Sequence, residues 1–166
     1  MLDPVHTNLN SLSMTAHETY MRRCLELAEV AQARGDVPVG SLVVKDNITL
    51  AEASERLPAS LDIAGHAELL AVRQACAALN TLDLSGCVLY TTAEPCWMCS
   101  YVIREAHISL VVIGTPTLTV GGLSSQYPLL SDAALRHWPA PPHIVRNVLL
   151  AECQALRQPP SVDSRQ

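Results

Sequence analysis

Two short clusters of metal-ligand residue types place the strongest constraint on how this chain folds. One is HAE at residues 66–68, and the other is PCWMC at residues 95–99. Each stands at the start of a segment whose composition predicts a helix. Imidazole and thiolate are the ligands that zinc takes in proteins, usually in a tetrahedral arrangement. A fold that uses His66, Cys96 and Cys99 together must bring two helix starts from different parts of the chain into contact.

The ligand count indicates a catalytic zinc site. Cys96 and Cys99 are three residues apart, so on a helix both sulfurs project from one face, and the helix N-terminus favours their thiolate forms. Together with His66 they give three protein ligands. A water then takes the fourth tetrahedral position, which is typical of catalytic rather than structural zinc. We therefore expect one Zn²⁺ per chain with a zinc-bound water.

Glu68 adds a base beside these ligands. Residues i and i+2 of an ideal helix point about 200° apart, so His66 and Glu68 converge only at a helix end. We expect His66 in the first turn, with Gly65 and Ala67 small enough to leave room for a planar ligand. Zinc lowers the pKa of its bound water to about 7. A carboxylate can pass that proton to a ring nitrogen and to a departing amine, which predicts hydrolytic deamination.

A protein with a structural zinc and no turnover, such as a binding module, is the alternative to an enzyme. A closed site normally has four protein ligands, whereas these clusters supply three. The presence of Glu68 beside the open position also favours an enzyme.

Hydrophobic periodicity and turn signals predict a single α/β domain. The order of elements predicts a three-layer α/β/α sandwich around a mixed five-stranded sheet. We expect a flexible extension at 1–13, the domain at 14–158 and a flexible tail at 159–166. Pro95 is expected at the first helical position of its helix. The predicted helices are 15–34, 64–79, 96–105 and a last helix ending before residue 159, and the predicted strands are 41–46, 48–53, 87–90, 110–113 and 144–148.

Composition argues for a well-buried core and against a long nucleic acid as partner. Hydrophobic residues make up 49% of the chain and charged residues 16%, with a net charge of −5. Nucleic-acid affinity depends largely on Lys and Arg contacts to phosphates, and the chain has only 11 such residues. No apolar run is long enough to span a membrane and no export signal is evident. We expect a cytoplasmic protein with reduced thiols.

The pairing of H-x-E with a later P-C-x-x-C is the signature of zinc deaminases. With the segments at 17–31, 35–46 and 149–156, the chain resembles the cytidine/deoxycytidylate deaminase superfamily. It is similar to the branch that holds tRNA adenosine deaminases, bacterial guanine deaminases and fungal cytosine deaminase. The resemblance implies a cytidine deaminase-like fold, zinc on His66, Cys96 and Cys99, and Glu68 as proton shuttle. It also implies a homodimer, because relatives are commonly dimers.

One departure from these relatives bears on the substrate. They usually carry Asn eleven residues before the metal-binding His, where its amide holds the base, and this chain has Glu55. An ionised carboxylate only accepts hydrogen bonds. A Glu55 that faces the pocket therefore favours a base edge rich in N–H groups, such as guanine or an aminotriazine. Alternatively, Glu55 is a solvated hairpin residue beside Arg56, or a gap shifts the alignment.

A second departure lies after the predicted strand 110–113. The segment 115–126 (TPTLTVGGLSSQ) is uncharged where tRNA-acting relatives carry charge, and the tail at 157–166 lacks their basic run. We therefore expect a small substrate, namely a free nucleobase, nucleoside or aminotriazine, with tRNA adenosine as the alternative. The irregular stretch 114–143 predicts a loop over the site. Trp97 either stacks on the substrate or packs under its helix start.

Overall fold

The structure is a computed structural model that describes residues 13–57 and 60–158. Its elements follow the predicted order of helices and strands. The predicted extension and tail lie outside the described residues, apart from Ser13, which caps the first helix. The elements are α1 (Met14–Ala33), β1 (Gly40–Lys45), β2 (Ile48–Ser54), α2 (Ala67–Leu79), β3 (Val88–Ala93), α3 (Trp97–Glu105), β4 (Leu110–Thr115), β5 (His143–Val145) and α4 (Leu150–Arg157).

The five strands form one mixed sheet in the order β2-β1-β3-β4-β5, so the predicted fold class is confirmed. β1 pairs antiparallel with both β2 and β3, whereas β3, β4 and β5 run parallel. Asp46 and Asn47 connect the β1–β2 hairpin, and both have positive φ angles. Such a turn matches the twist of the flanking strands, which explains the tight connection.

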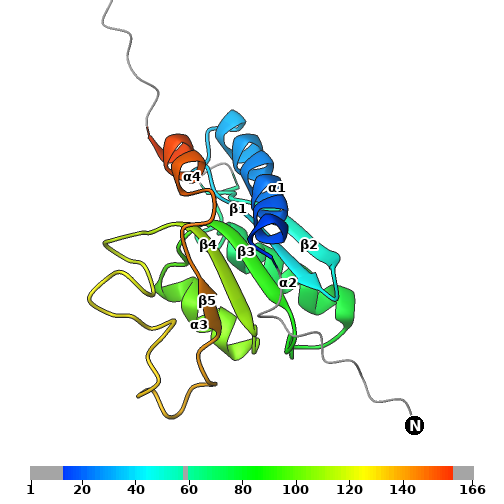
Figure 1. Cartoon of the computed structure of the whole chain (residues 1–166), viewed down its shortest axis with the longest axis vertical. Coiled ribbons are helices and arrows are strands. Elements are labelled where there is room, and N and C mark those ends of the chain that lie inside the picture. The colour runs from blue at the N-terminus through cyan, green and yellow to red at the C-terminus, as the bar shows by residue number, and fades with distance from the viewer. Residues whose placement is uncertain (1–12, 58–59, 159–166) are drawn as a thin grey trace, which may run out of the picture.

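Two apolar clusters, one on each face of the sheet, make up most of the core. Successive strand residues point to opposite faces, so Leu42 and Val44 pack on the side of α1 and α4, while Val43 packs on the side of α2 and α3. β3 and β4 alternate in the same way. The result is the predicted three-layer sandwich (Figure 1). None of the helices in 13–57 and 60–158 is long and apolar enough to cross a membrane.

The strand directions explain why α2 and α3 begin close together. β2 and β3 are both antiparallel to β1, so they run in the same direction and end at the same edge of the sheet. α2 is the helix after β2, and α3 is the helix after β3. Loops and helix starts at the carboxyl ends of strands are a common location for ligand sites in α/β folds.

Both of these helices begin later than predicted. His66 and Cys96 are N-cap residues with extended backbones, at φ −68° and ψ 138° for His66 and φ −69° and ψ 177° for Cys96. The prediction of His66 in the first helical turn is therefore wrong, and so is that of Pro95 at the first helical position. An extended N-cap lies off the helical path, which lets a side chain turn in a direction that the helix would not allow.

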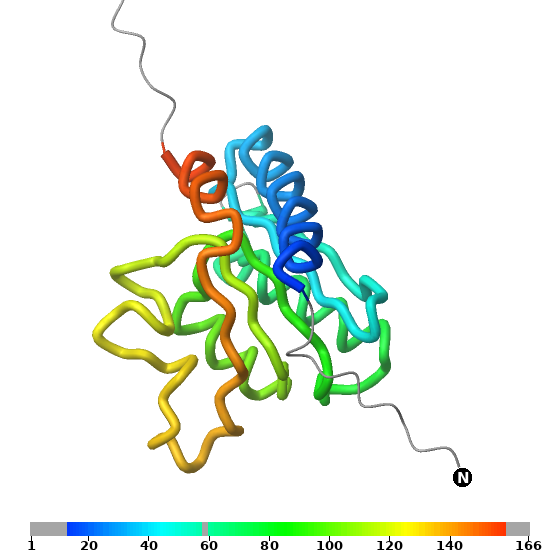
Figure 2. The backbone as a smooth tube through the Cα atoms, viewed as in Figure 1, coloured from blue at the N-terminus to red at the C-terminus, as the bar shows by residue number. Residues whose placement is uncertain are grey.

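The segment 116–142 contains no helix or strand and runs beside α3 (Figure 2). Arg104, only 1% exposed, attaches this segment to α3. Its guanidinium donates hydrogen bonds to the backbone oxygens of Leu129, Asp132 and Pro139, at 2.7 to 3.0 Å. Charge-assisted hydrogen bonds of this kind are strong, so Arg104 holds much of the predicted loop in place.

Candidate metal centre and active site

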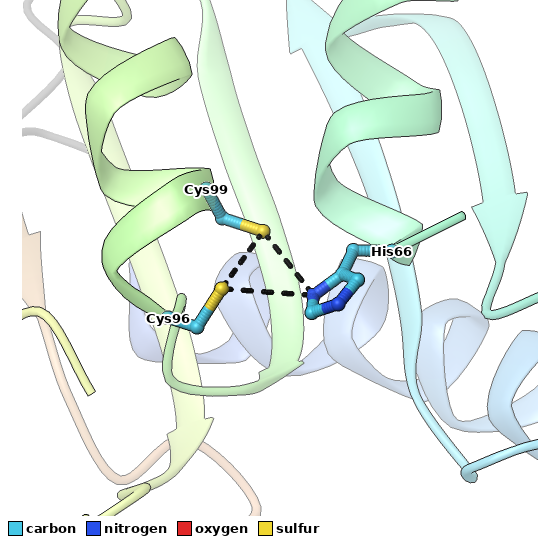
Figure 3. Close-up of side chains that lie close together, drawn as sticks. All are labelled: His66, Cys96 and Cys99. Atoms are coloured by element: carbon cyan, nitrogen blue, oxygen red, sulfur yellow. Dashed lines mark hydrogen bonds between the residues drawn. The ribbon is translucent and has the colours of Figure 1, made fainter. Parts of the chain in front are cut away.

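His66, Cys96 and Cys99 converge between the N-termini of α2 and α3 (Figure 3). The His66 Nδ1 atom lies 3.6 Å from Cys96 Sγ and 3.5 Å from Cys99 Sγ, and the two sulfurs are 3.6 Å apart. A tetrahedral zinc, with bonds of about 2.3 Å to sulfur and about 2.0 Å to nitrogen, places its ligand atoms roughly 3.5–3.8 Å apart. The three side chains therefore fit zinc, with Nδ1 as the His66 ligand atom.

The electrostatics of the three ligands also favour a cation. The hydrogen bond from Cys99 and the neighbouring His66 lower the pKa of Cys96 to about 4. The Cys96 sulfur in turn raises the pKa of His66 to about 9, against the effect of burial. Cys99, which shares its proton with Cys96 and is buried, has a pKa well above the usual range. Zinc takes neutral imidazole and thiolate ligands, so its binding here would release a proton from Cys99 and one from His66.

Glu68 lies in the first turn of α2 beside this cluster and is only 4% exposed. One of its carboxylate oxygens and a His66 ring nitrogen are within 4.8 Å of each other. Burial, reinforced by the negative charge of Glu55, raises the pKa of Glu68 to about 8. A carboxyl with a pKa near neutrality can both take up and release a proton under working conditions.

Glu55 comes directly after β2 and faces the same cluster. Its side chain is 4% exposed, and its carboxylate also lies within 4.8 Å of the His66 and Glu68 ligand atoms. The backbone N–H of Ala67 donates a 2.9 Å hydrogen bond to Glu55 Oε2. Burial raises the pKa of Glu55, while the Ala67 N–H and His66 oppose this rise. The alternative of a solvated hairpin residue is therefore wrong.

Gly65, Ala67 and Trp97 are the other predicted substrate contacts, and each makes a different packing or hydrogen-bond contact near the site. A Cβ atom on Gly65 would come within 3.0 Å of the Asp62 carbonyl oxygen, so the lack of a side chain there allows Gly65 to pack against Asp62 and Arg56. Ala67 is fully buried and contributes its N–H to Glu55. Trp97 is half-buried and donates from Nε1 to Ser125 Oγ at 2.9 Å, so it packs against the long loop.

Sequence reasoning missed the role of Glu94, which is 3% exposed at the end of β3. Its carboxylate accepts hydrogen bonds from the backbone N–H groups of Leu123, Ser124 and Thr117 and from the Ser124 hydroxyl, at 2.6 to 3.3 Å. A Cβ atom on Gly121 would collide with this carboxylate. Glu94 thereby fixes the loop wall beside the cysteines. The sequence offered one signal for this role, namely a charged residue between a buried strand and a proline.

The fold and this site define a zinc-dependent hydrolase of heterocyclic amines. Such chemistry needs three protein ligands, which would leave zinc one position for water, and an adjacent buried carboxyl, and this site has both. The chain belongs to the cytidine and deoxycytidylate deaminase family, whose zinc-binding region matches residues 14–115. The family, zinc as cofactor and the deaminase type of enzyme are thereby confirmed.

Several relatives resemble the chain over most of its length. The tRNA-specific adenosine deaminase of Aquifex aeolicus is 37% identical over 120 residues, which are 72% of this chain and 80% of that protein. A solved structure from studies of A-to-I editing by tRNA:A34 deaminases has a TM-score of 0.78 at 29% identity, covering 83% of this chain and 98% of that one. The guanine deaminase of Nitrosomonas europaea has a TM-score of 0.70 at 25% identity, covering 84% and 82%.

Proposed function

We propose that this deaminase converts adenosine to inosine in tRNA. The observation that supports this substrate best is the similarity to proteins named tRNA-specific adenosine deaminase. These include the Aquifex protein and one from Bacillus subtilis that is 32% identical over 84% of this chain. The match favours the tRNA alternative over the small heterocycle that the sequence analysis expected first.

The site residues have two separate roles in the proposed reaction, metal binding and proton transfer. His66, Cys96 and Cys99 would hold zinc, which when bound makes a water nucleophilic near neutral pH. The Glu68 carboxylate accepts a proton from the attacking water and delivers it to the ring nitrogen of the amidine. A second transfer through the same carboxyl protonates the departing amine. The C–N bond breaks and ammonia leaves. The oxygen of the consumed water becomes the ring carbonyl oxygen of inosine, one of its protons stays on the ring nitrogen, and the other leaves with ammonia.

A free aminopurine such as guanine is the second candidate substrate, because two observations favour a small molecule. The buried Glu55 carboxylate lies beside Glu68, and it accepts hydrogen bonds from N–H groups such as those of guanine. The net charge of −5 and the uncharged segment 115–126 offer little attraction to phosphates. Guanine deaminase structures are also among the similar folds.

A panel of ammonia-release assays separates the candidates. The purified zinc-loaded protein is given a tRNA anticodon stem-loop with adenosine at the wobble position, adenosine, guanine, guanosine, cytosine, cytidine and an aminotriazine. We expect kcat/KM for the stem-loop to exceed that for free adenosine by at least about 100-fold, because remote contacts to RNA contribute binding energy to the reaction. Turnover of guanine without turnover of the stem-loop would replace the first candidate by the second.

We also propose that the protein is a homodimer. An apolar hollow of about 420 Å³ opens between α2 and α3, the helices that begin at the site. Leu82 at its border is 82% exposed, and exposed apolar hollows of this kind favour protein contacts. Sedimentation velocity at micromolar concentration should give twice the chain mass, whereas a monomer would contradict the proposal. The hollow is lined by Val72, Arg73, Cys76, Leu82, Val102, Glu105 and Ala106.

A further inference from the structure

We infer that Arg104 is a positioning residue for the metal centre, because it binds the long loop at 116–142 to α3 and thereby holds the two cysteines toward His66. Cys96 is the N-cap of α3 and Arg104 lies near its other end, roughly 12 Å away along a helix. Arg104 therefore acts through the loop and the helix and not by contact with the ligands. The inference goes beyond the proposed function, since both candidate substrates would use the same metal centre.

One face of α3 is covered by the long loop (Figure 2). Cys96, Ser100 and Arg104 are spaced four residues apart, so they lie on the same side of the helix. The loop contacts α3 at each of these positions. At the first of them, Cys96 and Gly121 form an isolated antiparallel β-bridge. The loop is therefore bonded directly to a residue that carries a metal ligand.

At the second position the loop backbone lies against Ser100. A Cβ atom on Gly122 would collide with the Ser100 hydroxyl, so the missing side chain allows this close approach. The Gly122 N–H donates to the Pro95 carbonyl oxygen at 2.8 Å, and the Leu130 N–H donates to the Gly122 carbonyl oxygen at 2.9 Å. Leu130 is fully buried in the same apolar cluster as Cys99. Gly122 thus connects the start of α3 to a later, buried part of the loop.

At the third position the Arg104 guanidinium binds that later part of the loop. Nε and Nη2 donate to the Pro139 carbonyl oxygen, and Nη1 donates to those of Leu129 and Asp132. The Cζ atom of Arg104 lies 5.1 Å from the centre of the Trp138 ring. Among the residues that the structure describes, no carboxylate forms an ion pair with this buried cation. A buried charge without partners is strongly destabilising, so Arg104 and the loop backbone depend on each other.

These contacts form a continuous path from Arg104 to the cysteines. Arg104 holds the Leu129 carbonyl, and the next residue of the loop binds Gly122. Gly122 in turn binds the residue directly before Cys96. Because α3 has only nine residues and short helices are marginal by themselves, tertiary contacts determine its position. Without Arg104 we expect the loop to separate from α3 and the start of the helix to move relative to His66.

Arg104→Met tests the inference, because Met has a similar length and is readily buried but donates no hydrogen bonds. We expect the dissociation constant of zinc, measured by competition with a chromophoric chelator, to rise by at least about 10-fold, as on loss of an outer-shell partner. Electrostatics alone predicts the opposite sign, since removal of a buried cation favours the binding of Zn²⁺. The absorption bands of the cobalt-substituted protein should also shift, because they depend on the ligand geometry.

Two further variants separate positioning from lost stability and lost charge. Met21→Ala is the stability control, since Met21 is fully buried on α1, on the other face of the sheet. It should lower Tm through the cavity that it leaves, yet keep zinc affinity and the cobalt bands unchanged. Arg104→Lys keeps the charge but loses the planar fork. It should weaken zinc binding as well, by less than Arg104→Met.

The outcomes that contradict the inference are specific to the metal centre. Unchanged or tighter zinc binding by Arg104→Met would overturn it, and so would an equal weakening in Met21→Ala. If Arg104→Met does not fold, unchanged zinc binding by Arg104→Lys overturns it instead. Neither the zinc titration nor the cobalt spectrum requires turnover. Absence of ammonia release from every substrate would therefore contradict the proposed function and leave the test of Arg104 intact.

Discussion

Glu68→Gln is expected to abolish nearly all ammonia release while the protein keeps one zinc per chain. Glu68 is a buried carboxyl beside the ligand cluster, and it is assigned both proton transfers. Removal of a general acid–base typically costs 10²–10⁴-fold in rate. We expect a loss of at least about 10³-fold, because one group serves two steps. Gln preserves the size of the side chain but cannot take up a proton.

Zinc content by mass spectrometry and kcat by ammonia release distinguish a lost proton carrier from a lost metal. Glu29→Gln is a suitable control, since Glu29 is an exposed carboxylate on α1, across the sheet from the site. It should match the wild type in both measurements. Activity of Glu68→Gln within tenfold of the wild type would contradict the role assigned to Glu68.

The order of elements and the layers of the fold could be predicted because they depend on local patterns. The apolar run at 42–44 and the Asp46-Asn47 turn each determine one step of the sheet. The zinc cluster was predictable for a different reason, since His66, Cys96 and Cys99 are residue types with few other uses at such spacing. The residues at which α2 and α3 begin could not be predicted, because a slightly longer or shorter helix has the same apolar pattern.

Contacts between distant segments were beyond the reach of sequence patterns. Nothing near Glu94 indicates that its hydrogen-bond donors come from residues 117–124, and nothing near Arg104 indicates its partners in the long loop. The burial of Glu55 depends on the fold of the loop after it, where the Arg56 N–H donates to the Gly65 carbonyl oxygen at 2.9 Å. That contact turns the chain back toward α2, and Glu55 thereby faces His66.

Loss of a metal ligand is expected to have the largest effect on stability. Cys99→Ala removes a sulfur that is fully buried between α2 and α3. Zinc held by both helices contributes its binding free energy to folding, and each kcal/mol lost lowers Tm by about 2–4 °C in a domain of this size. We expect zinc content below about 0.1 per chain and a Tm lower by more than about 10 °C.

A chelator separates the metal effect from the cavity that the missing sulfur leaves. Treatment of the wild type with a strong chelator should lower its Tm to within a few degrees of that of Cys99→Ala, since a single sulfur cavity costs only about 1 kcal/mol. The Tm of Cys99→Ala itself should not respond to chelator.

Cys76→Ala is the control, because Cys76 is a half-buried thiol on α2 away from the cluster. Zinc loss from Cys76→Ala equal to that from Cys99→Ala, or full zinc in Cys99→Ala, would show that the ligands lie elsewhere. A Tm drop in Cys99→Ala with no response of the wild type to chelator would assign the stability to packing of the sulfur alone, because only bound metal makes the folded state sensitive to a competitor for zinc.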